Sequence, residues 1–381
     1  MTSRKKILIL VDWFSPGYKA GGPIRSCVNI CSALSADYDI YVLTTDTDHG
    51  ETTPYKAIVA DKWLFNKQLG VHVFYARQKQ ISPQQIAKEI AFIDADFVYL
   101  NHLFSPYFVI YPLWLKWKGQ IKTKVIVAPR GALYDSALSL KKYKKLPLLK
   151  LYKWLGLQHK VVFHATNTRE QQAIENYFKG STSVVADNLP ATNQPIFTDC
   201  LKEVGKLNCI FIARVVPIKN LLYLLQILQQ IQQQICLTIV GPIENEIYWQ
   251  DCTKCIATMP DNIRINYIGP KENEELPQLI QQHHLFILPT TGENFGHSIF
   301  EALLNGRPVL ISDQTPWLQL EEQSTGWDLP LNCPEKFAET IKTVAMYNQV
   351  EYNKYALGAW QYAHNFINNP AAKQQYLNMF K

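Results

Sequence analysis

One stretch decides the fold of this chain: Leu285-Phe-Ile-Leu-Pro-Thr-Thr-Gly-Glu293-Asn-Phe-Gly296-His-Ser-Ile-Phe-Glu301-Ala-Leu-Leu-Asn-Gly306-Arg-Pro-Val-Leu-Ile-Ser312. Its apolar runs predict buried strands over 285–288 and 308–311, joined by a polar loop and a helix over 298–305. Strand, helix and strand in this order form a βαβ unit of a parallel sheet. The loop then lies at the carboxyl edge of the sheet, where such sheets bind ligands, and the helix directs its amide-rich N-terminus there. The stretch therefore predicts a site for an anionic group.

Two glutamates, Glu293 and Glu301, bracket this loop with seven residues between them. This E-x₇-E spacing resembles that of the family 4 retaining glycosyltransferases of bacterial polysaccharide and lipopolysaccharide synthesis, which have the GT-B fold. The resemblance implies that Glu293 contacts the donor sugar and that Glu301 holds the ribose hydroxyls of the nucleotide. The residues between them to which the resemblance gives a donor-binding role are Asn294, Phe295, Gly296, His297 and Ser298. Residues 312–317 and 326–328 are also similar to bacterial members of this family.

A structural interpretation of the same glutamate stays open at this point. Ser298-Ile-Phe-Glu301 fits a capping box, in which Glu301 only satisfies an amide at the start of the helix. Gly296 favours the ligand-binding interpretation, because a glycine lets the backbone approach a ligand closely.

The second half of the chain opens with a strand over 208–213, followed directly by Arg214-Val-Val-Pro-Ile-Lys219. An arginine and a lysine five apart on a strand-to-helix loop can both face one diphosphate, arginine as a bidentate fork and lysine as a point charge. The family has a similar phosphate-binding pair, so the resemblance implies that Arg214 and Lys219 act with Glu293 in catalysis. Gly241 ends the next strand, in a loop that lies beneath the nucleotide base in such folds. For Arg214 and Lys219, the alternative is that they lie on an ordinary surface loop.

In the first half, a strand over 7–12 leads to a tight loop that contains Gly21 and Gly22. In the family, the corresponding loop approaches the donor phosphates. Further strands are predicted over 39–44, 71–75, 96–101, 124–128 and 161–164. His102 and Arg130 follow two of these strands. The Arg130-Gly-Ala-Leu-Tyr segment resembles a family segment that lines the cleft on the acceptor side, and His102 is a candidate to lie near the reacting sugar. A lone histidine at a strand end is more often a packing or hydrogen-bonding residue.

The length of 381 residues and the hydrophobic content of 47% allow two α/β domains with separate cores. The resemblance implies a GT-B fold, in which two Rossmann-like doubly wound domains face a central cleft. We expect an acceptor-side domain over 1–195 and a nucleotide-sugar-binding domain over 206–365. A terminal helix over 366–381 should pack back toward the first domain. The Pro- and Asn-bearing stretch from about 184 to 205 is predicted to be the linker.

Charge is divided unevenly between the two halves. Residues 1–195 contain 25 Lys and Arg against 14 Asp and Glu, or +11, which leaves 38 − 25 = 13 basic and 32 − 14 = 18 acidic residues, or −5. The excess is concentrated over 114–160, where twelve basic residues and three tryptophans accompany one acid, Asp135. A solvated helix face is one explanation. An anionic membrane surface fits the aromatic residues better, and no motif supports nucleic acid.

Neither a metal nor another cofactor is predicted. The nearest match to a metal-binding Asp-x-Asp is Asp46-Thr-Asp48, which lies in the first domain, away from the predicted donor loop. Eight cysteines are scattered along the chain and are expected to be free thiols. The Cys252-Thr-Lys-Cys255 pair lacks the partners of a zinc site. The apolar runs are too short for a signal peptide or a membrane span, so we expect a cytoplasmic protein.

The expected activity is metal-independent transfer of a hexose-type sugar from a nucleotide-sugar to a saccharide acceptor. The acceptor is expected to be lipid-linked, and the setting to be surface-polysaccharide synthesis (O-antigen, capsule or similar) on the inner face of the cell membrane. Two alternatives remain open. One is a non-catalytic GT-B protein that binds nucleotide-sugar or lipid, and the other is a GT-B epimerase or phosphorylase.

Overall fold

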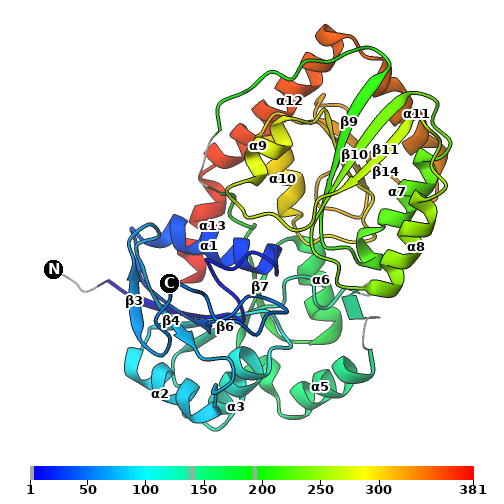
Figure 1. Ribbon diagram of the computed structural model, residues 1–381. Helices are drawn as coiled ribbons and strands as arrows, with labels where there is room; N and C mark the ends of the chain where they lie inside the picture. The colour runs from blue at the N-terminus through cyan, green and yellow to red at the C-terminus, as the bar shows by residue number, and fades with distance from the viewer. Residues whose placement is uncertain (1–3, 135–136, 139–141, 192–194) are drawn as a thin grey trace. The chain divides into compact units, whose positions relative to one another are not determined.

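A computed structural model describes residues 4–134, 137–138, 142–191 and 195–381. The chain forms two compact units: unit 1 contains Met1–Thr192 and Pro370–Lys381, and unit 2 contains Asn193–Asn369. Each unit has a largely parallel sheet with helices on both faces (Figure 1). The prediction of two Rossmann-like α/β domains is therefore confirmed. Residues 192–194, in the expected linker, lie outside the described residues.

The sheet of unit 1 has eight strands in the order β3-β4-β2-β1-β5-β6-β7-β8, all parallel except β3, which pairs antiparallel with β4. The strands are β1 Lys6–Leu10, β2 Asp39–Thr45, β3 Trp63–Asn66, β4 Val71–Ala76, β5 Phe97–Asn101, β6 Lys124–Ala128, β7 Val162–Ala165 and β8 Thr182–Val185. Every strand expected in this half is present. Strands β3 and β8 are additional to those predicted, and β8 occupies the start of the expected linker.

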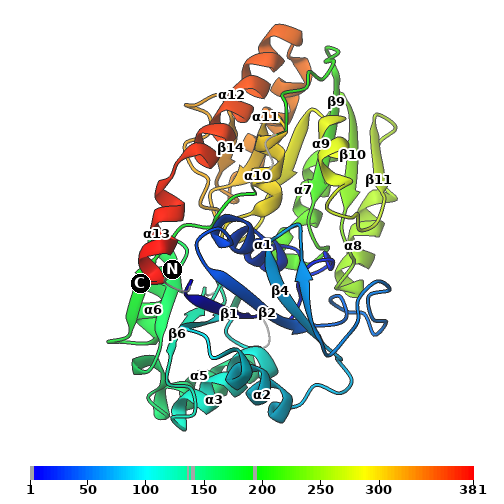
Figure 2. The same cartoon turned by 90° about the vertical axis from the view of Figure 1, so that its left-hand side faces the viewer.

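The helices of unit 1 cover its sheet from both sides. They are α1 Gly22–Leu34, α2 Pro83–Ile93, η1 Pro106–Ile110, α3 Tyr111–Trp117, α5 Lys142–Trp154, η2 Leu157–His159, α6 Thr168–Tyr177 and α13 Ala371–Met379. One core packs α1 and α13 against the sheet, and the other packs α2, α3, α5 and α6 against the opposite face. Figure 2 shows α1 on one side of the strands and α2, α3 and α5 on the other. Both faces of the sheet are thus buried.

The C-terminal helix α13 is an integral part of unit 1. Tyr376 is fully buried, with its ring 5.1 Å from that of His164, and Lys373 forms an ion pair with Asp37. The terminal helix expected over 366–381 is interrupted, because α12 of unit 2 continues to Asn368 before α13 begins at Ala371.

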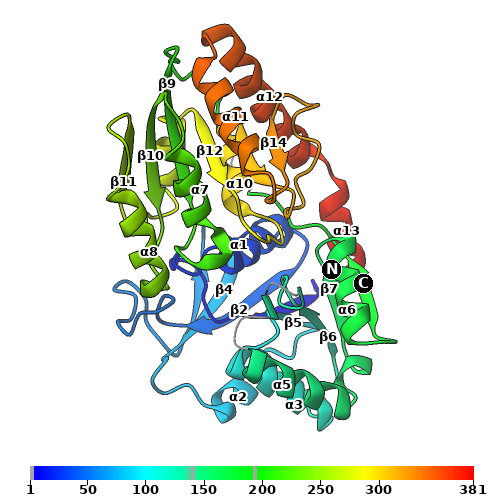
Figure 3. The ribbon, with the colours of Figure 1, turned by 90° about the vertical axis from the view of Figure 1, so that its right-hand side faces the viewer.

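The sheet of unit 2 has six parallel strands in the order β11-β10-β9-β12-β13-β14. They are β9 Lys206–Ile212, β10 Gln234–Val240, β11 Ile263–Tyr267, β12 Leu285–Leu288, β13 Val309–Ser312 and β14 Gly326–Leu329. The helices are η3 Pro217–Lys219, α7 Leu221–Leu228, α8 Glu246–Ile256, α9 Leu276–Gln281, α10 His297–Leu304, α11 Pro334–Met346 and α12 Gln349–Asn368. Figures 1 and 3 show α7, α8 and α11 on one face, with α9, α10 and α12 on the other.

Candidate functional site

The order of strands in unit 2 identifies one place where a ligand should bind. Strands β9 and β12 are neighbours, yet β9 connects to β10 on one side and β12 connects to β13 on the other. The loops that leave β9 and β12 therefore diverge at the carboxyl edge, which is the topological switch point of an open α/β sheet. The loop after β9 contains Arg214 and Lys219, and the loop after β12 contains Glu293 to Gly296. Most of the candidates expected in unit 2 thus lie on these two loops or in the helix α10 that follows the second, while Gly241 lies on the neighbouring loop after β10.

Hydrogen bonds tie these two loops to each other. The carbonyl of Ile218 accepts from the amide of Thr291 at 2.8 Å and from the hydroxyl of Thr290 at 2.9 Å. Ser312, at the end of β13, donates its hydroxyl to the carbonyl of Thr290. The amide of Glu293 donates to the carbonyl of Gln314 at 3.0 Å. Three neighbouring loops therefore form one preorganised surface.

The side chains of Lys219 and Glu293 form an ion pair across this surface. Both are largely covered, with side-chain exposures of 15% and 13%. The pair joins two residues for which the sequence analysis expected separate roles, one toward phosphate and one toward the donor sugar. An ammonium group has three donors, so Lys219 can hold Glu293 and still meet an incoming anion. The carboxylate therefore also serves to position the lysine.

Arg214 lies on the same loop and has a different partner. Its Nη1 lies 2.9 Å from Oε2 of Glu244, and the two side chains are 39% and 22% exposed. Glu244 follows β10, the neighbour of β9, and was not among the expected residues. Its position three residues after Gly241 at a strand end was the available signal. Because this pair is more exposed than that of Lys219, the guanidinium is the more accessible of the two cations.

Helix α10 begins at His297, with Gly296 as its N-cap in the left-handed region at φ 78°. Side chains other than hydrogen rarely adopt this conformation, so glycine is favoured there. The capping-box alternative is wrong, because Ser298 lies inside the first turn and is not the cap. A glycine cap offers no side chain to the first helical amides, which leaves this helix start suited to an anionic ligand.

A buried tryptophan supports the loop that precedes α10. Trp317 is 3% exposed, and its indole N–H donates to the carbonyl of Phe295. Its ring also packs against the rings of Phe295 and Phe300, with centroids 5.1 Å and 5.5 Å apart. This contact gives a physical role to the 312–317 segment, which the sequence analysis had noted only as similar to the family.

Gly241 is required by a close approach between two strand ends. A Cβ there would lie 2.0 Å from the carbonyl oxygen of Ala213, and the residue has φ 141°. Its carbonyl accepts from the hydroxyl of Tyr267 at 2.9 Å. A contact of this loop with a nucleotide base stays a prediction, because packing alone explains the glycine.

The expected residues of unit 1 lie at the carboxyl edge of its own sheet. Gly21, at φ 66°, is the N-cap of α1, whose first residue is Gly22. His102 follows β5 with φ 94°, an uncommon conformation for a residue with a side chain. Its amide donates to the carbonyl of Ala128 at 2.9 Å. Backbone strain of this kind is found most often at functional sites.

Arg130 belongs to a polar network inside unit 1. Its Nε donates to Asn101 at 2.9 Å, its Nη2 to the hydroxyl of Tyr99 at 2.7 Å, and its Nη1 to Asn188. The Tyr99 hydroxyl also lies 2.7 Å from Nδ1 of His164. Burial, together with the charge of Arg130, lowers the pKa of His164 to about 3. The guanidinium thus first stabilises the strand ends, and a contact with an acceptor stays a prediction.

The carboxylates of Asp46 and Asp48 both have structural partners. Asp46 accepts from the amide of Gln78, and Asp48 accepts from the amides of Tyr18, Lys19 and His49. Across the described ranges 4–134, 137–138, 142–191 and 195–381, no group of three or more His, Cys, Asp or Glu side chains is arranged to hold a metal ion. All eight cysteines are free thiols.

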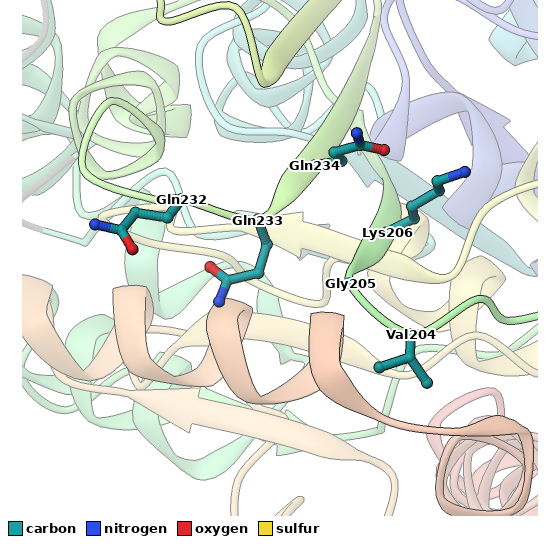
Figure 4. A pocket seen from close by; sticks show the side chains of 6 residues that line it. All are labelled: Val204, Gly205, Lys206, Gln232, Gln233 and Gln234. Atoms are coloured by element: carbon teal, nitrogen blue, oxygen red, sulfur yellow. The ribbon is translucent and has the colours of Figure 1, made fainter.

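One surface hollow of unit 2 lies far from these loops along the strands. Figure 4 shows that it is lined by Val204, Gly205, Lys206 and residues 232–234, at the amino ends of β9 and β10. Most of these residues are exposed, and a single lysine is the only charged side chain among them. Because open α/β sheets bind ligands at the opposite edge, we assign no role to this hollow.

Residues 206–346 match the model of the family described as Glycosyl transferases group 1. The whole chain is also similar in structure to Anabaena HepE in complex with UDP and glucose, at 17% identity, with 99% of each chain covered and a TM-score of 0.72. Sucrose-phosphate synthase from Thermosynechococcus elongatus is similar at 14% identity, covering 99% of this chain and 98% of that one, with a TM-score of 0.73.

A third similar structure is WaaG, a glycosyltransferase involved in lipopolysaccharide biosynthesis, at 11% identity. The structural match covers 97% of this chain and 98% of the WaaG chain, with a TM-score of 0.67. No curated protein sequence matches. The predicted GT-B fold is confirmed, and the match over 206–346 supports the class of glycosyltransferase.

Proposed function

We propose that this protein is a retaining, family 4 glycosyltransferase that moves a hexose-type sugar from a nucleotide-sugar to a saccharide acceptor. One observation carries the proposal. The loops at the switch point of unit 2 combine Arg214, the Lys219–Glu293 pair and the glycine-capped start of α10. Two cations and a helix start without a capping side chain, on preorganised loops, form a site for a diphosphate. The same segment lies within the match to Glycosyl transferases group 1.

The chemistry follows from where charge develops. When the bond between the sugar and the nucleoside diphosphate breaks, negative charge grows on the departing phosphate. Preorganised cations and amides stabilise that charge more than they stabilise the bound donor, which lowers the barrier. Arg214 and Lys219 supply the cations, and residues 294–298 supply the amides. Glu293 binds a hydroxyl of the donor sugar, and Glu301 binds the ribose.

Unit 1 contributes the acceptor side of the reaction in this proposal. Its glycine loop at Gly21 and Gly22 approaches the donor phosphates, and His102 lies near the reacting sugar. No divalent metal is needed, because Arg214 and Lys219 neutralise the leaving group.

We further propose that the acceptor is lipid-linked and that unit 1 docks on the cytoplasmic face of the cell membrane during surface-polysaccharide synthesis. Helix α5 supports this. Tyr143, Leu151 and Trp154 project from it with exposures of 73%, 46% and 80%. They are spaced at helical intervals along one stripe, and four exposed lysines flank them, at 142, 144, 150 and 153.

Apolar side chains flanked by lysine suit the headgroup region of an anionic bilayer. Trp114 and Trp117, on α3, add two more partly exposed aromatic rings. Asp135 and Lys141, which belong to the same basic stretch, lie outside the described residues. Within the described part of the chain, no helix combines the length and hydropathy that a membrane crossing requires.

Thermal unfolding in the presence of UDP-, GDP- and ADP-sugars identifies the donor. A ligand at 100 times its Kd stabilises the protein by about 2.7 kcal/mol. The stabilising donor is then incubated with the protein and EDTA, and release of nucleoside diphosphate is followed. We expect release that persists in EDTA and is lost in Lys219→Ala and Glu293→Ala.

The same experiment discriminates the alternatives. Tight donor binding without release would instead indicate a non-catalytic binding protein. Conversion that requires free phosphate would indicate a phosphorylase, and isomerisation of the sugar without transfer would indicate an epimerase. Proton NMR of the product reports whether the anomeric configuration of the donor is retained.

A further inference from the structure

Unit 1 has a switch point of its own, and a carboxylate lies there. Strands β1 and β5 are neighbours, while β1 connects to β2 on one side and β5 connects to β6 on the other. Asp12 lies just after β1, and Ser105 lies just after β5. The Ser105 hydroxyl donates to Oδ1 of Asp12 at 2.7 Å. This hydrogen bond spans the two strand ends between which an open α/β sheet receives its ligand.

The position of Asp12 is fixed by its surroundings. Its carbonyl accepts from the amide of Thr45 at 3.3 Å and from the hydroxyl of Thr45 at 2.6 Å, which ties it to the end of β2. Ser105 is 5% exposed and also accepts from the amide of Phe108. A carboxylate has about four acceptor positions, and Ser105 and the backbone amide of Asp12 itself occupy two of them. The group is therefore held rigidly with capacity for further donors.

Burial is costly for this carboxylate and raises the pKa of Asp12, while the hydrogen bond from Ser105 opposes the rise. Asp12 as a whole is nevertheless partly exposed. A desolvated acceptor at the edge of a sheet gains from a ligand that brings a hydroxyl donor. This is the chemistry that a sugar supplies.

The residue that follows Asp12 forms an aromatic pair with His49. Trp13 follows Asp12 in the chain, and its ring centroid is 4.5 Å from that of His49, at an interplanar angle of 77°. Both residues are partly exposed, and the charge of His49 acts on the carboxylate of Asp12. The amide of His49 is held by Asp48 at 2.7 Å. An aromatic surface beside fixed polar groups is the usual composition of a small-molecule site.

We propose that Asp12, Trp13 and His49 form the subsite for the acceptor sugar, with Asp12 accepting a hydrogen bond from a hydroxyl of an uncharged pyranose. This rests on the proposed function and adds the recognition of the acceptor to it. Trp13 packs against the apolar face of the ring, and His49 binds a second hydroxyl. The negative charge of Asp12 selects against acidic sugars at this subsite.

Saturation-transfer difference NMR tests this directly, with p-nitrophenyl glycosides of glucose, galactose, mannose, N-acetylglucosamine and glucuronic acid as probes. We expect saturable binding of at least one neutral glycoside to the wild-type protein and weaker binding of the glucuronide. Asp12→Asn should weaken binding of the neutral glycoside about tenfold, because a hydrogen bond to a charged group is stronger than one to a neutral group. Asp39→Asn, an exposed carboxylate at the amino edge of the same sheet, should leave binding unchanged.

A second variant separates recognition from a purely structural tie. If Asp12 only connects two loops, Ser105→Ala should weaken glycoside binding as much as Asp12→Asn does. If Asp12 contacts the sugar, Ser105→Ala should have the smaller effect and Trp13→Ala a loss similar to that of Asp12→Asn. Asp12→Asn should also unfold at or above the wild-type temperature, since it removes a buried charge and keeps the size of the side chain.

Three results would overturn the proposal. They are equal binding by Asp12→Asn and wild type, preference for the glucuronide, and a wild-type protein that no neutral glycoside saturates. The NMR readout needs no donor, so it is independent of whether the protein turns over a nucleotide-sugar. Failure of the proposed function would appear as absent nucleoside diphosphate release by the wild-type protein, whereas failure of this subsite would appear in the glycoside titration alone.

Discussion

Replacing Lys219 and Glu293 by glutamine, singly and together, tests the ion pair that joins the two loops of unit 2. Breaking a fully buried pair costs about 3–5 kcal/mol, because one charge is left unpaired, whereas an exposed pair contributes about 0–1 kcal/mol. With side chains 15% and 13% exposed, we expect each single variant to lower the free energy of unfolding by about 1–3 kcal/mol. The double variant leaves no unpaired charge, so its stability should lie within about 1 kcal/mol of wild type.

Differential scanning calorimetry measures these changes, because about 1 kcal/mol shifts the Tm of a domain of this size by about 2–4 °C. Turnover should follow another pattern. All three variants should release nucleoside diphosphate about 10²–10³ times more slowly, since each lacks a group that acts on the reacting donor. The exposed pair Lys254–Asp251 on α8 is the matched control, and neutralising either partner should change neither measurement.

Two results would refute this reasoning. Single variants that unfold with the wild-type Tm would show that the pair is not desolvated as its exposure indicates. A double variant with wild-type turnover would show that the two side chains serve only each other.

Three further predictions concern the helix start, its support and the basic surface. Glu301→Gln should unfold like wild type but bind the donor about tenfold more weakly in calorimetric titration, because the charged acceptor for ribose hydroxyls is lost; unchanged affinity would leave Glu301 a structural residue. Trp317→Phe keeps an aromatic ring but leaves the carbonyl of Phe295 without its indole donor, which should cost about 1–3 kcal/mol of unfolding free energy and weaken donor binding; wild-type values for both would show that Trp317 does not support the loop. In liposome sedimentation, binding should require anionic lipid, fall as salt shortens the Debye length, and be lost when four lysines of α5 are changed to glutamate, but not when four exposed lysines of unit 2 are. The α5 set is Lys142, Lys144, Lys150 and Lys153, and the control set is Lys254, Lys336, Lys342 and Lys354. Equal sedimentation with neutral lipid would identify α5 as a solvated face.

The parts of the fold that follow from local pattern could be predicted from the sequence. Strands β12 and β13 are buried along their whole length, so both faces require apolar residues and the strands appear as continuous apolar runs. The βαβ unit at 285–312 and the loop that carries Glu293 follow directly. Strand β3 was not predicted, because it is a half-exposed antiparallel edge strand. Such a strand has no buried face that would require a regular pattern of apolar residues.

Contacts between residues distant in the chain could not be predicted. Lys219 and Glu293 are 74 positions apart, and their pairing depends on β9 and β12 lying side by side. In the same way, Arg214 meets Glu244 because β9 and β10 are neighbours, and Asp12 meets Ser105 because β1 and β5 are neighbours. The N-cap of α10 was not predicted correctly, for a local reason. The Ser298-x-x-Glu301 pattern fits a capping box, but the same pattern can also occur inside a helix, and the N-cap is Gly296. Arg130 follows a strand as predicted, but its hydrogen bonds depend on two other segments, β5 and the residues after β8.

The central claim is that the loops after β9 and β12 bind the diphosphate of a nucleotide-sugar, and isothermal titration calorimetry with UDP, GDP and ADP tests it most directly. We predict that at least one of these nucleotides binds the wild-type protein in the presence of EDTA. Arg214→Ala and Lys219→Ala should each weaken that binding by about 1.5–3 kcal/mol, the contribution of a hydrogen bond to a charged group, which is about 10- to 100-fold in Kd. The claim would be contradicted if none of the three nucleotides bound, or if both variants bound with the wild-type Kd.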